Sequence, residues 1–360
     1  MIKKHIPLKT ITINKERKIG HKSEVYIIAE AGINHNGSVS NALLMIEVAA
    51  KCGADAIKFQ LFDVNSLATK AAPLASYQDT QNQIIKNQID LLKKYQFNKK
   101  TFLMLQKKAM ECKIDFLASA FDNQSQKFLI DLKVPILKIA SGEITNINLT
   151  EAASKSKLPT IISTGMATLV EIEDCINKFV KHNNKIILLH CVSMYPTPIK
   201  DLNLNFIKNL KKKFNTVVGF SDHSLGITAP IAAVAIGAKV IEKHFTLNKN
   251  WPGPDHKASL DTKELSQLVT AIRECEASLG INKKIITEEE ERTKKIVRKG
   301  LYARRNIEIG KIIDKSDISI LRPASEMSPE NMVKIIGKKL NKKLIKGDPF
   351  IKANVEGFYD

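Results

Sequence analysis

The chain has 360 residues, of which 44% are hydrophobic and 26% charged, and its formal net charge is +19. This length is enough for one large domain and a small one. No apolar run reaches membrane-spanning length and the start of the chain lacks a signal-peptide pattern, so we expect neither a membrane protein nor a secreted one. The lysines are dispersed along candidate helices and form no arginine-rich or aromatic-basic stripe, which argues against nucleic acid as a partner. The excess positive charge can still attract an anionic small substrate.

The five cysteines are odd in number and scattered, and no two of them have C-x-x-C spacing. Such a set predicts free thiols in a reducing compartment and not a disulfide framework or a zinc site. We therefore expect a cytoplasmic protein. The cysteines are Cys52, Cys112, Cys175, Cys191 and Cys275.

Eight short, apolar, β-rich segments alternate with helical patterns along the chain. Their near-continuous apolar character predicts strands that are covered on both faces. Eight such strands with helices between them predict a closed (β/α)₈ TIM barrel, for which about 250 residues is typical. The segments are 26–30, 56–60, 114–119, 136–141, 160–164, 186–191, 217–223 and 239–245.

The clearest helical patterns flanking these strands are 38–52 and 261–279, and the Ala-rich stretch 227–237 suits a crossover helix. A longer excursion, 62–98, is polar and Gln-rich. We expect it to cover the face of the barrel on which chemistry takes place.

Every predicted strand ends in a polar residue. One such residue is unremarkable at the start of a turn. In a barrel, however, all eight carboxyl ends open on one mouth, which is where active sites lie. The polar residues at these ends are Glu30, Lys58, Gln60, Ser119, Lys138, Ser141, Ser163, Ser193, Ser221, His223 and His244.

Two lysines stand inside apolar strands, where an unpaired ammonium is costly. Lys58 and Lys138 therefore need anions. Together with the serine hydroxyls they suit a ligand that carries a phosphate and a carboxylate. Glu30, Glu143 and Asp255 supply carboxylates that can bind sugar hydroxyls or move protons. Pairing of a lysine with a glutamate, without any ligand, is the alternative.

Two histidines, His223 and His244, lie 21 residues apart at the ends of the last two predicted strands. Two neutral imidazoles side by side suggest a divalent metal site, and hydrogen bonding at a strand end is the structural alternative. Because catalytic zinc usually has three protein ligands, a pair of histidines favours an exchangeable manganese- or magnesium-like ion that acts as a Lewis acid. Candidates for a third ligand are Asp222, Glu242 and Asp255.

Eight ordered motifs of the chain resemble bacterial N-acetylneuraminate (sialic acid) synthases and the related legionaminate and pseudaminate synthases. The resemblance runs over nearly the whole chain. The motifs are AEAGINHNG (29–37), KFQ (58–60), KIASGE (138–143), STGM (163–166), YPTP (195–198), SDH (221–223), EKHFT (242–246) and PGPDH (252–256).

This resemblance implies a metal-dependent condensation of phosphoenolpyruvate with the open-chain aldehyde of an N-acetylated amino sugar. Residues matching His223 and His244 would hold the metal, Mn²⁺ in the first place and Mg²⁺ or Co²⁺ as alternatives, which polarises the aldehyde. The phosphoenolpyruvate would be held by Lys58, Ser119, Lys138, Ser141, Ser163 and Ser221. Contact with the sugar or assistance in proton transfer would fall to Glu30, Gln60, Tyr195 and Asp255. Glu143 and Ser193 complete the predicted site, and the sequence does not single out the base.

The C-terminal part resembles the small antifreeze-like (SAF) domain of these synthases. We predict a barrel domain with an N-terminal extension over 1–281, a linker over 282–297 and the SAF domain over 298–360. In relatives this domain reaches over the partner's barrel, so the resemblance implies a domain-swapped homodimer. Arg322 matches the arginine that contacts the sugar's N-acetyl group, and an ordinary surface arginine is the alternative.

Three stretches depart from the family pattern near the place where the sugar is sensed: 118–121 (ASAF), 192–194 (VSM) and 324–326 (ASE). The acceptor is therefore open between N-acetylmannosamine, giving N-acetylneuraminate as the default, and 2,4-diacetamido-2,4,6-trideoxy-mannose, giving N,N′-diacetyllegionaminate. Two other classes stay open from the residues alone. One is an aldolase that forms a Schiff base through Lys58 or Lys138, and the other is a basic module that binds nucleic acid or polysaccharide.

Overall fold

The computed structural model of the protein describes residues 10–14, 17–20, 22–69, 71–74, 87–182 and 185–358. The chain divides into two compact units, Met1–Gly280 and Ile281–Asp360. The stretch 282–297, for which we predicted a linker, contains the helix α11 (Glu288–Val297). Among the described residues, no helix combines the length and the apolar character that a membrane crossing requires.

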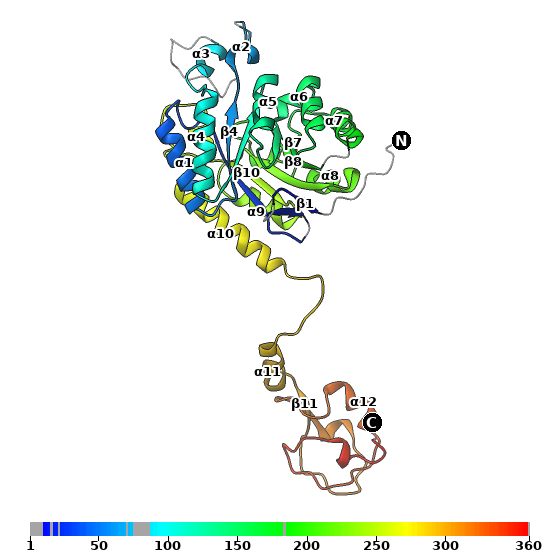
Figure 1. The fold of residues 1–360 in the computed structure, drawn as a ribbon. Helices are drawn as coiled ribbons and strands as arrows, with labels where there is room; N and C mark the ends of the chain where they lie inside the picture. The colour runs from blue at the N-terminus through cyan, green and yellow to red at the C-terminus, as the bar shows by residue number, and fades with distance from the viewer. Residues whose placement is uncertain are drawn as a thin grey trace. The chain divides into compact units, whose positions relative to one another are not determined.

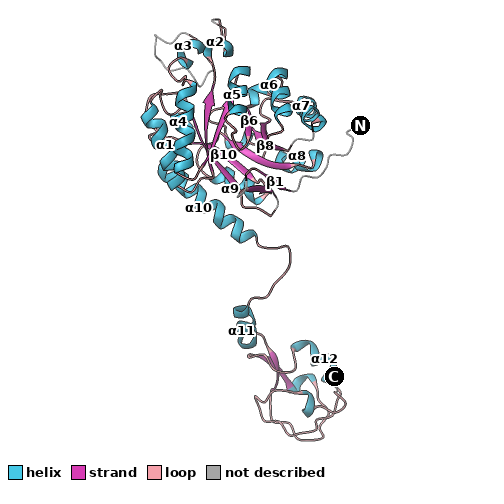
Figure 2. Cartoon of the chain, viewed as in Figure 1, coloured by secondary structure: helices cyan, strands magenta, loops and turns pink. Residues whose placement is uncertain are grey.

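The first unit is a closed parallel barrel of eight strands with helices around it, as the sequence predicts (Figures 1 and 2). The strands are hydrogen-bonded in the order β10-β3-β4-β5-β6-β7-β8-β9, so chain order is kept around the barrel and the last strand closes on the first. Their bounds are β3 Tyr26–Gly32, β4 Ala56–Leu61, β5 Asp115–Ala120, β6 Leu137–Ile139, β7 Thr160–Ser163, β8 Ile186–Cys191, β9 Val217–Asp222 and β10 Val240–His244.

Most of the surrounding helices, though not α8 and α9, begin at side chains that accept hydrogen bonds from their first free N–H groups. Ser38 caps α1, and Asp261 forms a capping box with Glu264 at the start of α10. The predicted helices at 38–52, 227–237 and 261–279 are present as α1, α9 and α10. The helices of this layer are α1 Val39–Lys51, α4 Lys99–Glu111, α5 Asn123–Asp131, α6 Ile147–Ser156, α7 Leu169–Lys181, α8 Phe206–Phe214, α9 Thr228–Ala235 and α10 Thr262–Leu279.

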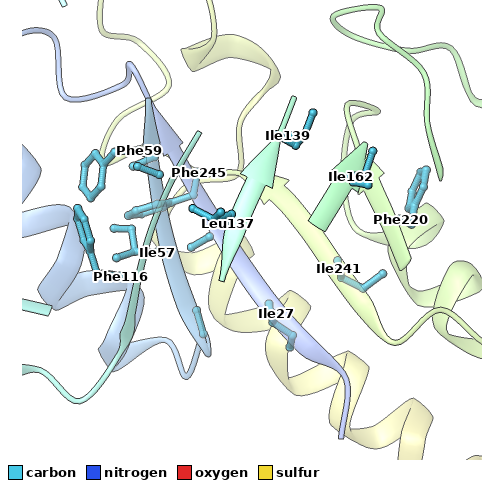
Figure 3. Close-up of a cluster of buried hydrophobic side chains, with 14 of the residues drawn as sticks. Ile27, Ile57, Phe59, Phe116, Leu137, Ile139, Ile162, Phe220, Ile241 and Phe245 are labelled. Carbon is cyan, nitrogen blue, oxygen red and sulfur yellow. The ribbon is translucent and has the colours of Figure 1, made fainter. Parts of the chain in front are cut away.

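Alternate residues along each strand enter two separate cores, because successive side chains of a strand point to opposite faces. Ile27 and Ile57 belong to the larger core between the strands and the helices (Figure 3). Their neighbours Ile28 and Ala56 belong to the smaller core inside the barrel.

An N-terminal hairpin covers the amino end of the barrel. Strands β1 (Thr10–Thr12) and β2 (Lys18–Gly20) pair antiparallel, and Ile11 and Ile19 join the inner core with the first residues of the barrel strands. Both isoleucines are fully buried. This end of the barrel is therefore packed and closed.

Part of the excursion at 62–98 forms a small core of its own. The short helices α2 (Val64–Leu67) and α3 (Gln88–Leu92) pack with Ile33 and Phe62, which follow β3 and β4. Residue 70 and residues 75–86 of the excursion lie outside the described residues.

The second unit has a separate core around the antiparallel pair β11 (Gly300–Ala303) and β12 (Ile318–Leu321). Leu301, Met327 and Phe350 are among its fully buried members. It also contains the short helix α12, Met332–Ile335. Across both units, the described residues form the 3₁₀ turns η2 Ser141–Glu143, η3 Ile199–Asp201, η4 His256–Ala258, η5 Lys315–Asp317, η6 Pro329–Asn331 and η7 Lys352–Asn354.

Candidate active site

A cavity of about 480 Å³ opens at the carboxyl ends of the barrel strands. It is lined by all the residues predicted for the site except Asp255 and Arg322. The predicted residues that line it are Glu30, Lys58, Gln60, Ser119, Lys138, Ser141, Glu143, Ser163, Ser193, Tyr195, Ser221, His223 and His244.

The alternation of the strands explains why these side chains meet. Tyr26 and Ile28 of β3 face the inner core, so Glu30, two residues further, faces the same way at the open end. In β10 the sequence of inward residues is Val240, Glu242 and His244. The inner face of the barrel is thus apolar below and charged at the mouth.

The charged centre of the cavity consists of two lysines and two glutamates, all buried. Lys58 Nζ lies 2.6 Å from Glu30 Oε2 and donates to Ser119 Oγ at 3.1 Å. Glu242 lies between the lysines, 3.7 Å from Lys58 Nζ and 3.6 Å from Lys138 Nζ. The lysine–glutamate pairing that we weighed as the alternative to ligand binding is therefore present in the structure.

Burial and charge move the pKa values of these groups in different directions. Burial raises the pKa of Glu30 to about 7, against the pull of Lys58. Burial also acts to raise the pKa of Glu242, but Lys138 and Lys58 lower it to about 2. Burial lowers the pKa of Lys138. The centre thus keeps one carboxylate ionised and holds another near its titration point at neutral pH.

Glu242 is the main residue of the cavity that was not predicted from the sequence to lie against the lysines. It was predicted only as a candidate metal ligand, whereas its carboxylate contacts both lysines and accepts from Ser221 Oγ at 2.9 Å. The signal was available, since Glu242 stands two residues before His244 and must share its face. Cys191, which we expected only to be a free thiol, also lines the cavity, and its Sγ lies 3.8 Å from His223 Nδ1.

The hydroxyls on the far side of the cavity come from the ends of β6, β7 and β8. Ser141 Oγ accepts a hydrogen bond from the Gly165 amide at 3.1 Å. A Cβ at Gly165 would lie 2.4 Å from Ser193 Oγ and 2.9 Å from Ser141 Oγ, so a larger residue there would displace these hydroxyls. Ser163 Oγ is buried without a hydrogen-bond partner among the described residues, which leaves a donor for a ligand.

The two histidines lie next to each other, with ring centroids 5.5 Å apart. His223 Nδ1 lies 2.8 Å from the Val192 carbonyl oxygen, which can only accept, so this nitrogen carries the proton and Nε2 stays free as a ligand. His244 Nδ1 is buried without a hydrogen-bond partner among the described residues. Burial, with a contribution from His223, holds the pKa of His244 well below its usual value.

These observations fit a divalent metal. Hydrogen bonding at a strand end accounts for one nitrogen of His223 but not for the unpaired nitrogen of His244, and a neutral imidazole is the form that binds metals. Within the described part of the chain, no three His, Cys, Asp or Glu residues are grouped as a metal site. Asp222 pairs with Lys243, and Glu242 lies between the two lysines. A divalent ion bound here would therefore have two histidine ligands, and its remaining positions would be open to water and substrate.

Asp255 lies beside the cavity lining, with its Oδ2 3.7 Å from His244 Nδ1. Burial raises its pKa to about 6. Arg322 belongs to the second unit, where it is exposed at the end of β12. The described part of the excursion contributes Leu67, Gln88 and Leu92 to the lining, in agreement with the predicted cover of the active face.

The barrel and its charged mouth define a (β/α)₈-barrel enzyme, and comparison with known proteins gives its family. Residues 45–284 match the model of the NeuB family, and residues 298–356 match the model of the SAF domain. The chain therefore belongs to the NeuB family and ends in a SAF domain, as the motifs predict.

Several relatives of the chain are named as synthases of legionaminic, pseudaminic or sialic acid, and the chain is an enzyme of this synthase class. It is 38% identical to the N,N′-diacetyllegionaminic acid synthase of Legionella pneumophila over 349 residues, which cover 96% of this chain and 98% of the relative. It is 42% identical to the enzyme of the same name from Campylobacter jejuni over 315 residues, 87% of this chain and 94% of the relative. Among solved structures, the sialic acid synthetase of Leptospira borgpetersenii in complex with citrate has 40% identity and a TM-score of 0.72, over 79% of this chain and 94% of that one.

Proposed function

We propose that the protein condenses phosphoenolpyruvate with 2,4-diacetamido-2,4,6-trideoxy-mannose to give N,N′-diacetyllegionaminate and phosphate. The observation that carries this proposal is the pair of relatives named as N,N′-diacetyllegionaminic acid synthases, which match the chain over nearly its full length. The sequence-based default, N-acetylneuraminate, thereby becomes the second candidate, and the similarity to the Leptospira sialic acid synthetase supports it.

The wall of the cavity supports a deoxy sugar. Leu67, Leu92 and Phe121 line it on the side of the excursion, and Met166 lines it near the end of β7. An apolar wall favours a methyl group over a hydroxymethyl group, which would lose its hydrogen bonds with water there. The trideoxy sugar carries a methyl at C6, whereas N-acetylmannosamine carries a hydroxyl.

The buried lysines provide the binding site for phosphoenolpyruvate in this proposal. Lys58 and Lys138 attract its phosphate and carboxylate, and hydroxyls of Ser119, Ser163 and Ser221 donate to them. In the absence of this ligand Glu30 and Glu242 neutralise the two ammonium groups. Binding of the anion therefore exchanges one set of ion pairs for another, which limits the desolvation cost of the buried lysines.

The reaction needs proton transfers at both ends of the new bond. The enol carbon bonds to the aldehyde carbon, whose oxygen gains a proton. Water adds to the phosphate-bearing carbon and loses one proton, and the resulting tetrahedral carbon expels phosphate as its hydroxyl loses the second proton and becomes the keto group. Glu30 and Asp255 have pKa values raised by burial to about 7 and about 6, so both can exchange protons near neutral pH. Gln60, Glu143 and Tyr195 line the cavity and would orient the sugar, and Ser141 and Ser193 would bind phosphoenolpyruvate.

His223 and His244 would hold the metal, for which Mn²⁺ is our first candidate and Mg²⁺ and Co²⁺ are alternatives. When bound, such an ion polarises the aldehyde as a Lewis acid. The Val192 carbonyl fixes the ring orientation and tautomer of His223 for this role.

We further propose a domain-swapped homodimer in which Arg322 of one copy contacts the N-acetyl group of the sugar held by the other. The match to the SAF domain supports this arrangement. Analytical ultracentrifugation of the full chain tests the dimer.

We propose a cytoplasmic location, with which the five free cysteines agree.

The decisive experiment is a phosphate-release assay with phosphoenolpyruvate and each of the two acceptor sugars, with and without Mn²⁺. We expect rapid release with the trideoxy sugar, slower release with N-acetylmannosamine, and none after chelation until Mn²⁺ is restored. Faster turnover of N-acetylmannosamine would favour the second candidate. Phosphate release from neither sugar would contradict the synthase proposal, and borohydride trapping of a pyruvate imine on a lysine would instead support the aldolase alternative.

A further inference from the structure

A buried ion pair joins the two strands that carry the histidines. Lys243 Nζ lies 2.5 Å from Asp222 Oδ2, and their side chains are 1% and 0% exposed. Asp222 is the last residue of β9 and precedes His223, while Lys243 precedes His244 at the end of β10. The two residues are direct partners in the parallel pairing of these strands.

The pair also anchors the loop that leaves β9. Asp222 Oδ1 accepts from the Ser224 amide at 2.8 Å, and Lys243 Nζ donates to the Ser224 carbonyl oxygen. Ser224 is fully buried, whereas Leu225 is exposed. His223 thus lies between Asp222, whose carboxylate pairs with Lys243 of β10, and Ser224, whose carbonyl oxygen accepts from the same lysine.

Neither Lys243 nor Asp222 lines the cavity, because strand alternation directs them to the helix side of the barrel. On the cavity side, Ser221 donates to Glu242, which is the preceding cross-strand pair in the register. Two consecutive links on opposite faces therefore fix β9 to β10 just before the histidines. A charged pair in this place is not needed for stability, because apolar residues of similar volume are often as stabilising. The pair instead fixes the position of the backbone around His223, through its hydrogen bonds to Ser224.

We propose that Lys243 and Asp222 are positioning residues, which hold the imidazoles of His223 and His244 at the separation that a divalent metal requires. The inference rests on the metal role proposed above. It concerns residues that touch neither the metal nor the substrate.

The test compares the affinity for Mn²⁺ of the full-length wild type with that of three full-length variants. Electron paramagnetic resonance of the free ion measures the binding. Replacing only Lys243 leaves a buried carboxylate without its partner and endangers folding. The main variant therefore carries Asp222→Leu together with Lys243→Met, which keeps the volume and removes the charges. Lys239→Met is the matched control, because Lys239 directly precedes the first residue of the same strand, where it donates to the Ser23 carbonyl oxygen at 2.9 Å. Asp222→Asn is a milder variant that keeps the shape of the side chain.

We expect the double variant to remain folded and to bind Mn²⁺ roughly 10- to 100-fold more weakly, the range typical for loss of groups that orient metal ligands. Asp222→Asn should lie between it and the wild type, and Lys239→Met should bind as the wild type does. Binding of phosphoenolpyruvate in the presence of a chelator should stay within about twofold, since the lysines that bind it are not altered; a purely structural defect would weaken it too. Equal Mn²⁺ affinity in the wild type and the folded double variant, or in Asp222→Asn if the double variant does not fold, would overturn the inference alone. Failure of the wild type to bind Mn²⁺ would overturn the metal role and this inference together.

Discussion

The two ends of the barrel are formed by the same eight strands, yet they differ in whether their polar side chains have hydrogen-bond partners. At the amino end, Asp55 accepts from Arg17, Arg273 and the Ile27 amide, and Tyr26 donates to Asp115 at 2.8 Å. The hairpin carrying Ile11 and Ile19 closes this end.

At the carboxyl end, in contrast, buried polar atoms are left without hydrogen-bond partners among the described residues. They include Ser163 Oγ, His244 Nδ1 and Glu242 Oε2, although this last oxygen lies 3.7 Å from Lys58 Nζ. Unpaired buried polar groups cost free energy unless a ligand satisfies them. The amino end therefore stabilises the barrel, while the carboxyl end retains unsatisfied polar groups that a ligand can satisfy, in the place where active sites of this fold lie.

The largest expected effect comes from changing the carboxyl end at a proposed metal ligand. His223→Ala should lower kcat/KM by at least about 100-fold, because one of the two proposed protein ligands is lost. Its free energy of unfolding should fall by only about 1 kcal/mol, the value of the lost hydrogen bond to Val192. Steady-state kinetics and urea unfolding measure the two quantities. His182→Ala, at an exposed helix end, is the control and should change neither; a large loss of stability in His223→Ala would contradict the contrast between the two ends.

The reverse effect is expected at the amino end. Asp55→Ala should lower the free energy of unfolding of the barrel by about 2–3 kcal/mol, because the two arginines, which are partly exposed, and the Ile27 amide lose their acceptor. Activity per folded molecule should not change. Urea unfolding followed by circular dichroism, together with kinetics well below the transition, tests this expectation. Asp131→Ala, at the exposed end of α5, serves as the matched control. Loss of activity in a folded Asp55→Ala protein would show that the two ends are not independent.

The smallest effect concerns pH and sharpens the role of the carboxyl end. The pKa of Glu30 is raised by burial to about 7, so its carboxyl group is mostly neutral below pH 7 and ionised above it. Ionisation places a negative charge beside Lys58 and opposes an anionic ligand. The dissociation constant of phosphoenolpyruvate should therefore increase by roughly three- to tenfold from pH 6 to pH 8, measured by isothermal titration calorimetry.

Glu30→Gln should remove most of that increase. Because the titration of the ligand itself contributes equally to the pH profiles of the wild type and the variant, it cancels in the difference between them. Glu151→Gln, on the exposed surface of α6, should behave as the wild type does. If Glu30→Gln leaves the pH profile unchanged, another group controls the affinity.

Much of the fold and of the mouth could be predicted from local patterns. Near-continuous apolar segments separated by helical ones predicted the eight strands, because strands covered on both faces must be apolar throughout. The polar residue at each strand end then predicted a common site, and the cavity contains Lys58, Lys138 and His244 as expected. The motifs predicted the family and the SAF domain, which the comparisons confirmed.

Other features depend on which strands become neighbours, and no local pattern contains that information. The position of Glu242 between Lys58 and Lys138 requires the closure of β10 on β3, two segments more than 200 residues apart. The link between Lys243 and Asp222 likewise depends on the register of β10 against β9.

The sequence by itself determined the strands, their polar ends and the residue types available for chemistry, because periodicity and turn chemistry act over a few residues. Only the tertiary structure decided which charges pair, which polar atoms stay unpaired and which pKa values shift. These properties depend on distance and burial, so residues remote in sequence set them together. Buried and partly buried polar residues therefore stabilise the protein at one end of the barrel and line the cavity at the other.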